Sequence, residues 1–316
     1  MLAYIVRRIV MLIPVLLVVG IVVFALVHIT PGDPAAVMLG QNATAEQIEQ
    51  LRGQLGLDRP IWEQFLEWIS GVVRLDFGES IFLGMPVIEA IQDRVQPTLL
   101  LTTYAMIIQI AIGIPVGVIS AIRSGSLLDR GLMILSISGA AIPTFFLGIV
   151  LILFFAVNLR WLPAGGYVPI TEDPVAHLKA MALPAFALGF SSAGLLARLV
   201  RSTMLDVMRE DYIRTAYAKG VTERSVITRH ALRNAMIPAL TVIGASVGAL
   251  LGGAVVTETV FTIPGMGRLV VQSIGRRDFP VIQGAVMLIA AVYVLVNLAV
   301  DILYVYIDPR VRYGGN

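Results

Sequence analysis

The 316-residue sequence contains no cysteine, only three histidines and few charged residues. Without cysteine, the chain can form no disulfide and has no thiolate chemistry. His28, His177 and His230 are too far apart in the sequence to form a metal-ligand motif. We therefore expect no metal and no cofactor. The formal net charge of +2 is also too small to indicate a nucleic-acid partner.

The residue patterns for two kinds of catalysis are missing as well. A Walker-type nucleotide-binding loop places a lysine directly before a serine or threonine. The two lysines of this chain, Lys179 and Lys219, precede an alanine and a glycine. Ser136 and Ser191 lie in apolar segments that contain no histidine or acid to activate a hydroxyl. The chain is therefore not expected to be an enzyme, and any ATP hydrolysis on which it depends must occur on another chain.

Hydrophobic residues, in contrast, are abundant: they make up 57% of the chain, and charged residues only 14%, against about 25% in soluble domains. A helix needs about 20 apolar residues to cross the ~30 Å hydrocarbon core of a bilayer. The sequence predicts an all-α membrane protein with six transmembrane helices. The predicted spans are residues 9–29, 98–122, 132–157, 180–197, 237–257 and 281–307.

The distribution of basic residues predicts the orientation of these spans, because cytoplasmic loops are enriched in Lys and Arg. With the N-terminus inside, the cytoplasmic segments contain 14 of the 23 Lys and Arg residues. These segments are residues 1–8, 123–131, 198–236 and 308–316. Both termini are therefore predicted to be cytoplasmic. The chain then divides into a first helix with its outer loop (1–97), a core of five helices (98–307) and a cytoplasmic tail (308–316).

The outer loop between the first two spans has helical patterns of its own. Thr44 and Gln47 have the spacing of a capping box, and Gly56 follows the apolar positions of the helix that this box would start. Pro60 suits the first position of a second helix with an apolar stripe. The loop is predicted to form short helices at the outer mouth. They would serve either as a lid over the helix ends or as a docking surface for a soluble partner.

The cytoplasmic loop 198–236 is longer than most connectors between two spans, which suggests a function of its own. It is predicted to form two short helices, 206–219 and 222–234. Gly220 would supply the left-handed residue that ends the first, and Thr222 would cap the second. A compact amphipathic element of this kind suits a groove on a partner protein. Alternatively, its basic residues anchor it on lipid headgroups.

The nine residues from Tyr212 to Gly220, YIRTAYAKG, resemble the coupling loop of permeases from ATP-driven (ABC) importers. Ala216 and Gly220 occupy the positions of the family's alanine and glycine. Arg214 stands where most of the family has glutamate, and Thr215 replaces the first alanine of the pattern. That departure is typical of the dipeptide and oligopeptide branch.

Further motifs of this branch follow in order along nearly the whole chain. They are TPGDP at 30–34, LGLDRP at 55–60, LDFG at 75–78, ETVF at 258–261, PGMGRL at 264–269 and DPR at 308–310. The resemblance implies a type I ABC importer permease fold in a bacterial inner membrane. It also implies a second homologous permease, two cytoplasmic ATPase subunits and an extracytoplasmic substrate-binding protein as partners. The substrates implied are dipeptides, oligopeptides or related small solutes such as glutathione or metal complexes, moved by alternating access.

Two groups of residues are candidates for the transport function. Coupling to the ATPases is predicted for Tyr212, Arg214, Ala216, Gly220, Glu223 and His230. Polar residues within the spans are candidates for the translocation path: Gln109, Thr144, Gln283 and Asn297. Asp301 in the last span could instead bind an ion or proton, which leaves a secondary transporter or a channel without ATPase partners as the alternative.

Overall fold

The computed structural model describes residues 2–29, 34–39, 43–54 and 56–307. Apart from one isolated bridge, between Glu79 and Pro86, their regular structure is helical. The chain divides into two compact units. The described part of unit 1 comprises residues 97–264 and 295–307, and that of unit 2 comprises residues 2–29, 34–39, 43–54, 56–96 and 265–294. The long helices α5 (Val87–Ile122) and α13 (Phe279–Ile307) contribute to both units.

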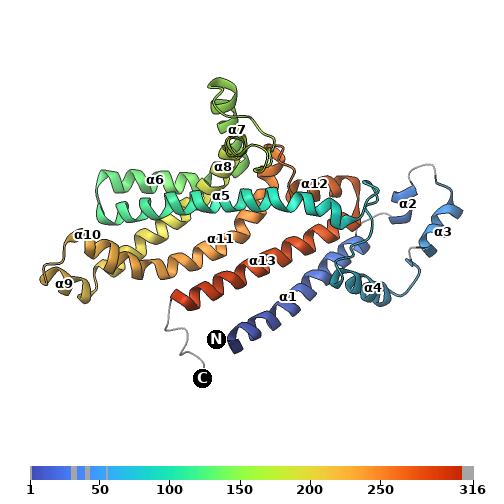
Figure 1. The fold of residues 1–316 in the computed structure, drawn as a ribbon, viewed down its shortest axis with the longest axis horizontal. Helices are drawn as coiled ribbons and strands as arrows, with labels where there is room; N and C mark the ends of the chain where they lie inside the picture. The colour runs from blue at the N-terminus through green and yellow to red at the C-terminus, as the bar shows by residue number, and fades with distance from the viewer. Residues whose placement is uncertain (1, 30–33, 40–42, 55, 308–316) are drawn as a thin grey trace. The chain divides into compact units, whose positions relative to one another are not determined.

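Unit 1 is built on long apolar helices that lie alongside each other (Figure 1). Besides parts of α5 and α13 it contains α6 (Leu127–Ala141), α7 (Thr144–Leu151), the π-helix η1 (Ile152–Asn158), α8 (Pro174–Met208) and α11 (Leu232–Val260). One buried cluster surrounds Leu188, Leu250 and Phe261. A second cluster, around Leu196 and Met204, lies beside the short elements between α8 and α11.

Glycines bring three helices of unit 1 into backbone contact. A Cβ atom at Gly117 of α5 would lie 2.6 Å from the carbonyl oxygen of Ala197 in α8. At Gly194 of α8 it would lie 2.1 Å from the carbonyl oxygen of Ser136 in α6. Small residues allow helices to approach this closely. The α5–α6–α8 packing is therefore tight, with little room for one helix to slide past another.

The predicted third span, 132–157, is a bent pair rather than a straight helix. The helix ends at Ala141, Ile142 is extended with ψ of 124°, and α7 begins at Thr144. The two halves meet at an angle of 104°. The cause is Pro143, which has no N–H to donate and disfavours helical backbone at the residue before it. The other five predicted spans lie within long helices, namely α1, α5, α8, α11 and α13.

Unit 2 contains the first long helix and several short ones, together with parts of α5 and α13. They are α1 (Leu2–Ile29), α2 (Pro34–Leu39), α3 (Ala45–Gln54), α4 (Ile61–Val73) and α12 (Met266–Arg276). The predicted capping box is confirmed: Thr44 N donates to Gln47 Oε1 at 2.9 Å, and Gln47 N donates to Thr44 Oγ1 at 3.3 Å. Pro60 is the N-cap of α4 rather than its first helical residue, and α2 was not predicted.

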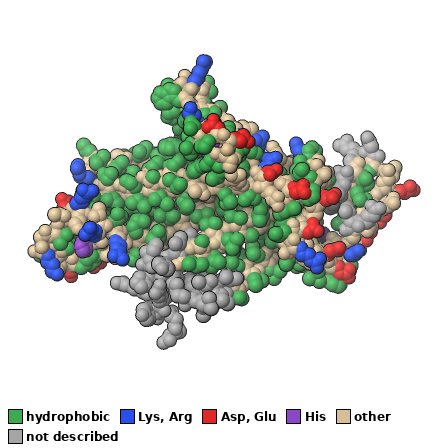
Figure 2. Space-filling view, viewed as in Figure 1, with side chains coloured by type: hydrophobic (Ala, Val, Ile, Leu, Met, Phe, Trp, Pro, Cys, Tyr) green, Lys and Arg blue, Asp and Glu red, His purple; other side chains and the backbone are tan. Residues whose placement is uncertain are grey.

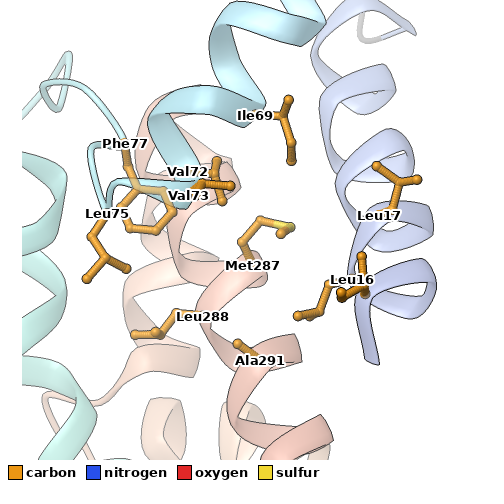
Figure 3. Close-up of a pocket in the computed structure, with 11 residues that line it drawn as sticks. Leu16, Leu17, Ile69, Val72, Val73, Leu75, Phe77, Met287, Leu288 and Ala291 are labelled. Atoms are coloured by element: carbon orange, nitrogen blue, oxygen red, sulfur yellow. The ribbon is translucent and has the colours of Figure 1, made fainter. Parts of the chain in front are cut away.

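In unit 2, α1, α4 and α13 surround an apolar groove with a volume of about 430 Å³. Figure 3 shows Leu16 and Leu17 of α1, Ile69 and Val72 of α4, and Met287 of α13 around it. All eleven lining residues are apolar. Such a lining has no polar group with which to orient a ligand, so the groove is not a specific polar binding site.

The loop before α5 is attached to the start of α13 by one carboxylate. Ser80 Oγ donates to Asp278 Oδ2 at 2.5 Å, Phe82 N donates to the same oxygen at 3.2 Å, and Ile81 N donates to Oδ1 at 3.2 Å. Arg276 lies over the Phe82 ring at 3.7 Å. These contacts fix the conformation of residues 80–82 within unit 2.

The predicted tail 308–316 and the motifs' residues 30–33 lie outside the described residues, as does the side chain of Asp301. Around the described part of the chain, basic side chains gather at the end formed by the elements between α8 and α11. The flanks of the long helices of unit 1 are mainly hydrophobic (Figure 2).

Candidate coupling site between α8 and α11

The segment between the fourth and fifth long helices has a different helix pattern from the predicted one. α8 continues to Met208, and α9 spans Asp211–Ala218. The predicted helix 206–219 is therefore wrong at its start, because a turn at Arg209 and the extended Glu210 separate the two helices. After α9, α10 (Glu223–Ser225) and the π-helix η2 (Val226–Ala231) lead directly into α11. We call residues 211–231 the coupling element.

A tight turn at Gly220 joins the two arms of this element. The first arm is α9, and the second consists of α10 and η2. Gly220 has a φ of +76°, as predicted for a left-handed helix end. Its N–H donates to the carbonyl of Tyr217 at 2.9 Å, and Val221 N donates to that of Ala216 at 3.2 Å. A Cβ atom at Gly220 would meet no atom within 4 Å, so the requirement for glycine concerns the backbone and not space. Thr222 occupies the N-cap position, but its side chain makes no capping hydrogen bond.

The inner face of α9 packs against its own chain. Ile213 and Ala216 are 1% and 8% exposed, and they belong to the same buried cluster as Met204, Val226 and Ala231. The small side chain at Ala216 therefore allows α9 to lie close to its neighbours. This face holds the element on the end of α8.

The outer face of α9 is exposed and polar. Tyr212 is 42% exposed, and its hydroxyl oxygen accepts a hydrogen bond of 2.7 Å from Asn234 Nδ2 in α11. Arg214 pairs with Asp211 at 3.2 Å, an exposed contact that contributes little to stability. Glu223 is exposed at the start of the second arm. The Tyr212–Asn234 bond thus connects the outer face of α9 to the following long helix.

The half-buried His230 lies in η2, and its backbone carbonyl accepts a 3.2 Å hydrogen bond from Asn234 Nδ2. The six predicted coupling residues therefore fall into two groups. Ala216 faces the chain's own core and Gly220 sets the turn. The other four lie on the exposed or half-buried sides of the element, where a partner could contact them.

The four predicted translocation-path residues lie in α5, α7 and α13. Gln109 is buried, and its Oε1 accepts a hydrogen bond of 3.0 Å from Ser246 Oγ in α11. Thr144 is the first residue of α7, and Asn297 lies half-buried in α13. Gln283 belongs to unit 2, whereas the other three belong to unit 1. Their role in translocation stays a prediction.

Several buried polar residues were missed by the sequence analysis. Asp129 in α6 is 3% exposed and forms an ion pair with Arg201 of α8. Glu258, near the end of α11, is fully buried and accepts a hydrogen bond of 2.5 Å from Thr98 Oγ1. Ser126, three residues before Asp129, caps α6. The spacing of these two residues is a helix-start pattern that the sequence offers near the Asp129–Arg201 pair. The pairings themselves join segments far apart in the sequence.

A third polar group of unit 1 lies near the start of α8. The buried His177 has Nδ1 2.7 Å from the carbonyl oxygen of Val168 and Nε2 3.2 Å from the Tyr104 hydroxyl. The ring of Tyr167 packs edge-on against that of His177. Burial, followed by the effect of Tyr104, raises the pKa of the Tyr167 hydroxyl. Among the described residues, no group of three His, Cys, Asp or Glu side chains could hold a metal ion.

Five long apolar helices and one bent pair define a multi-pass α-helical membrane protein, with an exposed helical element between two of its spans. Residues 113–313 match the family of binding-protein-dependent transport system inner membrane components, and residues 1–102 match its N-terminal part. The chain belongs to this family. It is thus a permease subunit of an ATP-driven importer.

Relatives of known name match over nearly the full length. A protein of Sinorhizobium fredii named a probable peptide ABC transporter permease is 45% identical over 98% of this chain and 99% of its own. The glutathione transport system permease protein GsiC of Escherichia coli is 44% identical over 99% of this chain and 100% of its own.

Solved structures of the MetNI methionine ABC transporter in inward-facing conformations have the same fold. One matched chain has a TM-score of 0.58 and 21% identity, covering 70% of this chain and 97% of that chain. The other has a TM-score of 0.56 and 20% identity. This similarity confirms the predicted type I permease fold for the matched part of the chain.

Proposed function

We propose that this chain is one of two homologous permease subunits of an importer that moves peptides, including glutathione, across the bacterial inner membrane by alternating access. Two cytoplasmic ATPase subunits would drive the cycle, and an extracytoplasmic binding protein would deliver the substrate. The observation that carries this proposal is the two-faced coupling element. Its apolar face is buried in unit 1, and its polar face is exposed.

The shape of the element supports its role as the ATPase docking surface. α9 has only eight residues, yet it is held at Ile213 and Ala216 by buried packing and at Tyr212 by a hydrogen bond to α11. When a partner protein displaces a short helix fixed in this way, the movement is passed to the helices that hold it. Helix-in-groove recognition is a common way for a protein to bind such an element.

The orientation supports the same proposal. Basic side chains gather at the end of unit 1 formed by α9 and α10 (Figure 2). With both termini in the cytoplasm, as we propose, this end would lie on the cytoplasmic side. The ATPases bind nucleotide there. The α5–α6 turn (residues 123–126) then lies on the same side, and the connection between η1 and α8 lies outside.

The substrate class rests on the full-length relatives. Both peptide and glutathione permeases match at 44–45% identity from end to end. Glutathione is itself a tripeptide, so the two names describe one chemical class, a short chain with amide bonds and charged ends. We propose this class as the substrate.

The first test is co-purification of the tagged chain with its native partners from membranes in mild detergent. Ala218, an exposed alanine on α9, is replaced by arginine or, as the matched control, by serine. The added bulk and charge of Ala218→Arg are expected to abolish recovery of the ATPase subunits. Ala218→Ser should recover them like the wild type, and both variants should accumulate normally because the position is exposed.

The outcomes separate two errors. If the wild type recovers no ATPase subunit, the importer proposal is wrong. If Ala218→Arg recovers as much ATPase as the wild type, the importer stands but the docking surface is not the outer face of α9. Uptake of labelled glutathione and tri-alanine into vesicles that contain the complete complex then tests the substrate class.

A further inference from the structure

The buried carboxylate of Asp129 joins three segments of unit 1, one of which is α8, the helix that precedes the coupling element. Asp129 Oδ1 accepts hydrogen bonds from Ser120 Oγ of α5 and from Arg201 Nε of α8, the latter at 2.7 Å. Asp129 Oδ2 accepts from Gly125 N of the α5–α6 turn and from Arg201 Nη2, both at 2.8 Å. Each carboxylate oxygen thus has two donors. α6 carries the acceptor, and the donors come from α5, the turn and α8.

A lysine in place of Arg201 could not form the two parallel hydrogen bonds to the Asp129 carboxylate. Two parallel N–H···O bonds fix the orientation of the guanidinium plane against the carboxylate, whereas an ammonium group acts as a point charge. The Asp129 side chain is 4% exposed and that of Arg201 28%, so solvent competes little for the carboxylate. The pair therefore fixes the position and the direction of the α5–α6 turn against α8.

The same part of α8 also carries the coupling element. Arg201 lies seven residues before the end of α8 at Met208, about 10 Å along the helix axis. Between them, Thr203 Oγ1 lies 3.3 Å from the carbonyl oxygen of Ala235 in α11. Met204 is fully buried in the cluster that contains the inner face of α9. The last two turns of α8 thus bind Asp129 of α6, which in turn binds the α5–α6 turn, and they also pack against the coupling element.

We propose that Asp129 and Arg201 are positioning residues of the transport cycle. They hold the α5–α6 turn on α8, so that the turn and the coupling element move as one body when the ATPases close. The inference rests on the proposed function, because it assumes that the ATPases move the coupling element. It extends that function by naming the contact that passes the movement from α8 to α5 and α6.

The test uses the absence of cysteine from the chain. Ser124→Cys in the turn and Thr228→Cys in η2, both at exposed positions, are spin-labelled in the complete complex. The distance between the labels is measured by pulsed electron paramagnetic resonance without nucleotide and with ATP trapped on the ATPases. This distance is expected to stay within about 2 Å, the size of a small helix shift.

The variant is Arg201→Lys, which keeps the charge but removes the paired hydrogen bonds. It is expected to broaden the distance distribution and to make its mean depend on nucleotide. Arg198→Lys, at an exposed arginine one turn earlier on α8, is the matched control and should behave like the unsubstituted chain. Ser120→Ala, which removes one donor from the carboxylate, is the milder second variant if Arg201→Lys does not accumulate, and a smaller broadening is expected.

Two results would overturn the inference. One is a distance in the unsubstituted complex that changes with ATP by more than a helix shift. The other is a distribution that none of the Asp129-contacting variants alters. Failure of the proposed function would be seen separately, because the purified complex would then contain no ATPase subunit. In that case the inference also fails, since it assumes that the ATPases move the coupling element.

Discussion

Glycines act at the residue scale in two different ways in this chain. At Gly220 the backbone has a positive φ and the space around it is open. At Gly194 the backbone is helical, and the missing side chain lets α8 touch the backbone of α6. The first position depends on conformational freedom and the second on size, so their substitutions should fail for different reasons.

Gly194→Ala should destabilise unit 1, because its Cβ would lie 2.1 Å from the carbonyl oxygen of Ser136. Overpacking of this kind costs roughly 1–3 kcal/mol of the free energy of unfolding, and the Tm in detergent should fall by several degrees. The matched control is Gly252→Ala in α11, where the added Cβ meets no atom within 4 Å. Its Tm should stay equal or rise slightly, since alanine favours helix. Equal losses in both variants would contradict the proposed packing.

Some residues with local roles were predictable from the sequence, whereas the pairing of residues with distant partners was not. Thr44 and Gln47 form their capping box within one turn, and Gly220 ends α9 through its own backbone. Asp129 and Arg201 are 72 positions apart, and no local pattern encodes their pairing. In the sequence, an aspartate near the start of a helix gives no indication of whether its carboxylate is solvated or buried.

At the scale of elements, α9 combines a buried inner face with a hydrogen bond from its outer side to α11. Tyr212→Phe removes that bond to Asn234. A hydrogen bond of this kind contributes about 1 kcal/mol, so the amides of α9 should exchange about five-fold faster through local opening. Hydrogen exchange of peptides covering 211–218 measures the effect. Tyr217→Phe, at an exposed position of the same helix, is the control, and acceleration in both variants would assign no special role to Tyr212.

The bent third span shows what hydropathy does not report. Residues 132–157 are predominantly apolar and contain no charged residue, so the sequence predicts one helix. Prolines also lie within other long helices: Pro14, Pro115, Pro184 and Pro238 interrupt neither α1, α5, α8 nor α11. A proline in an apolar run is therefore no sufficient signal for a break. At Pro143 the extended Ile142 and the contacts of α7 with α8 and α11 complete the bend.

At the scale of the whole molecule, the orientation of the chain is a prediction from its basic residues. Ser124 and Glu172 are exposed on connections predicted to lie on opposite sides of the membrane. In the cysteine-free chain, Glu172→Cys should react with an impermeant maleimide in cells whose outer membrane alone is permeable. Ser124→Cys should react only after the inner membrane is opened. The reverse pattern would place the coupling element outside and would exclude cytoplasmic ATPases as its partners.

The number of spans, the fold class and the family could all be predicted at this scale, because they depend on apolar length and on many short motifs along the chain. The translocation path could not. Gln109 is a polar residue in an apolar helix, but its bond to Ser246 depends on the rotation of α5 against α11. Hydropathy gives the length of a helix and not the direction in which each side chain points.

The bend at Pro143 also affects how the protein is made. α6 has 15 residues, and α7 and η1 have 8 and 7, so each half is about 22 Å long at 1.5 Å per residue. Neither half alone crosses a hydrocarbon layer of about 30 Å. In the folded chain the packing of α6 depends on α8, whose Gly194 touches the backbone of α6. We therefore expect stable integration of the third span to require synthesis of the fourth.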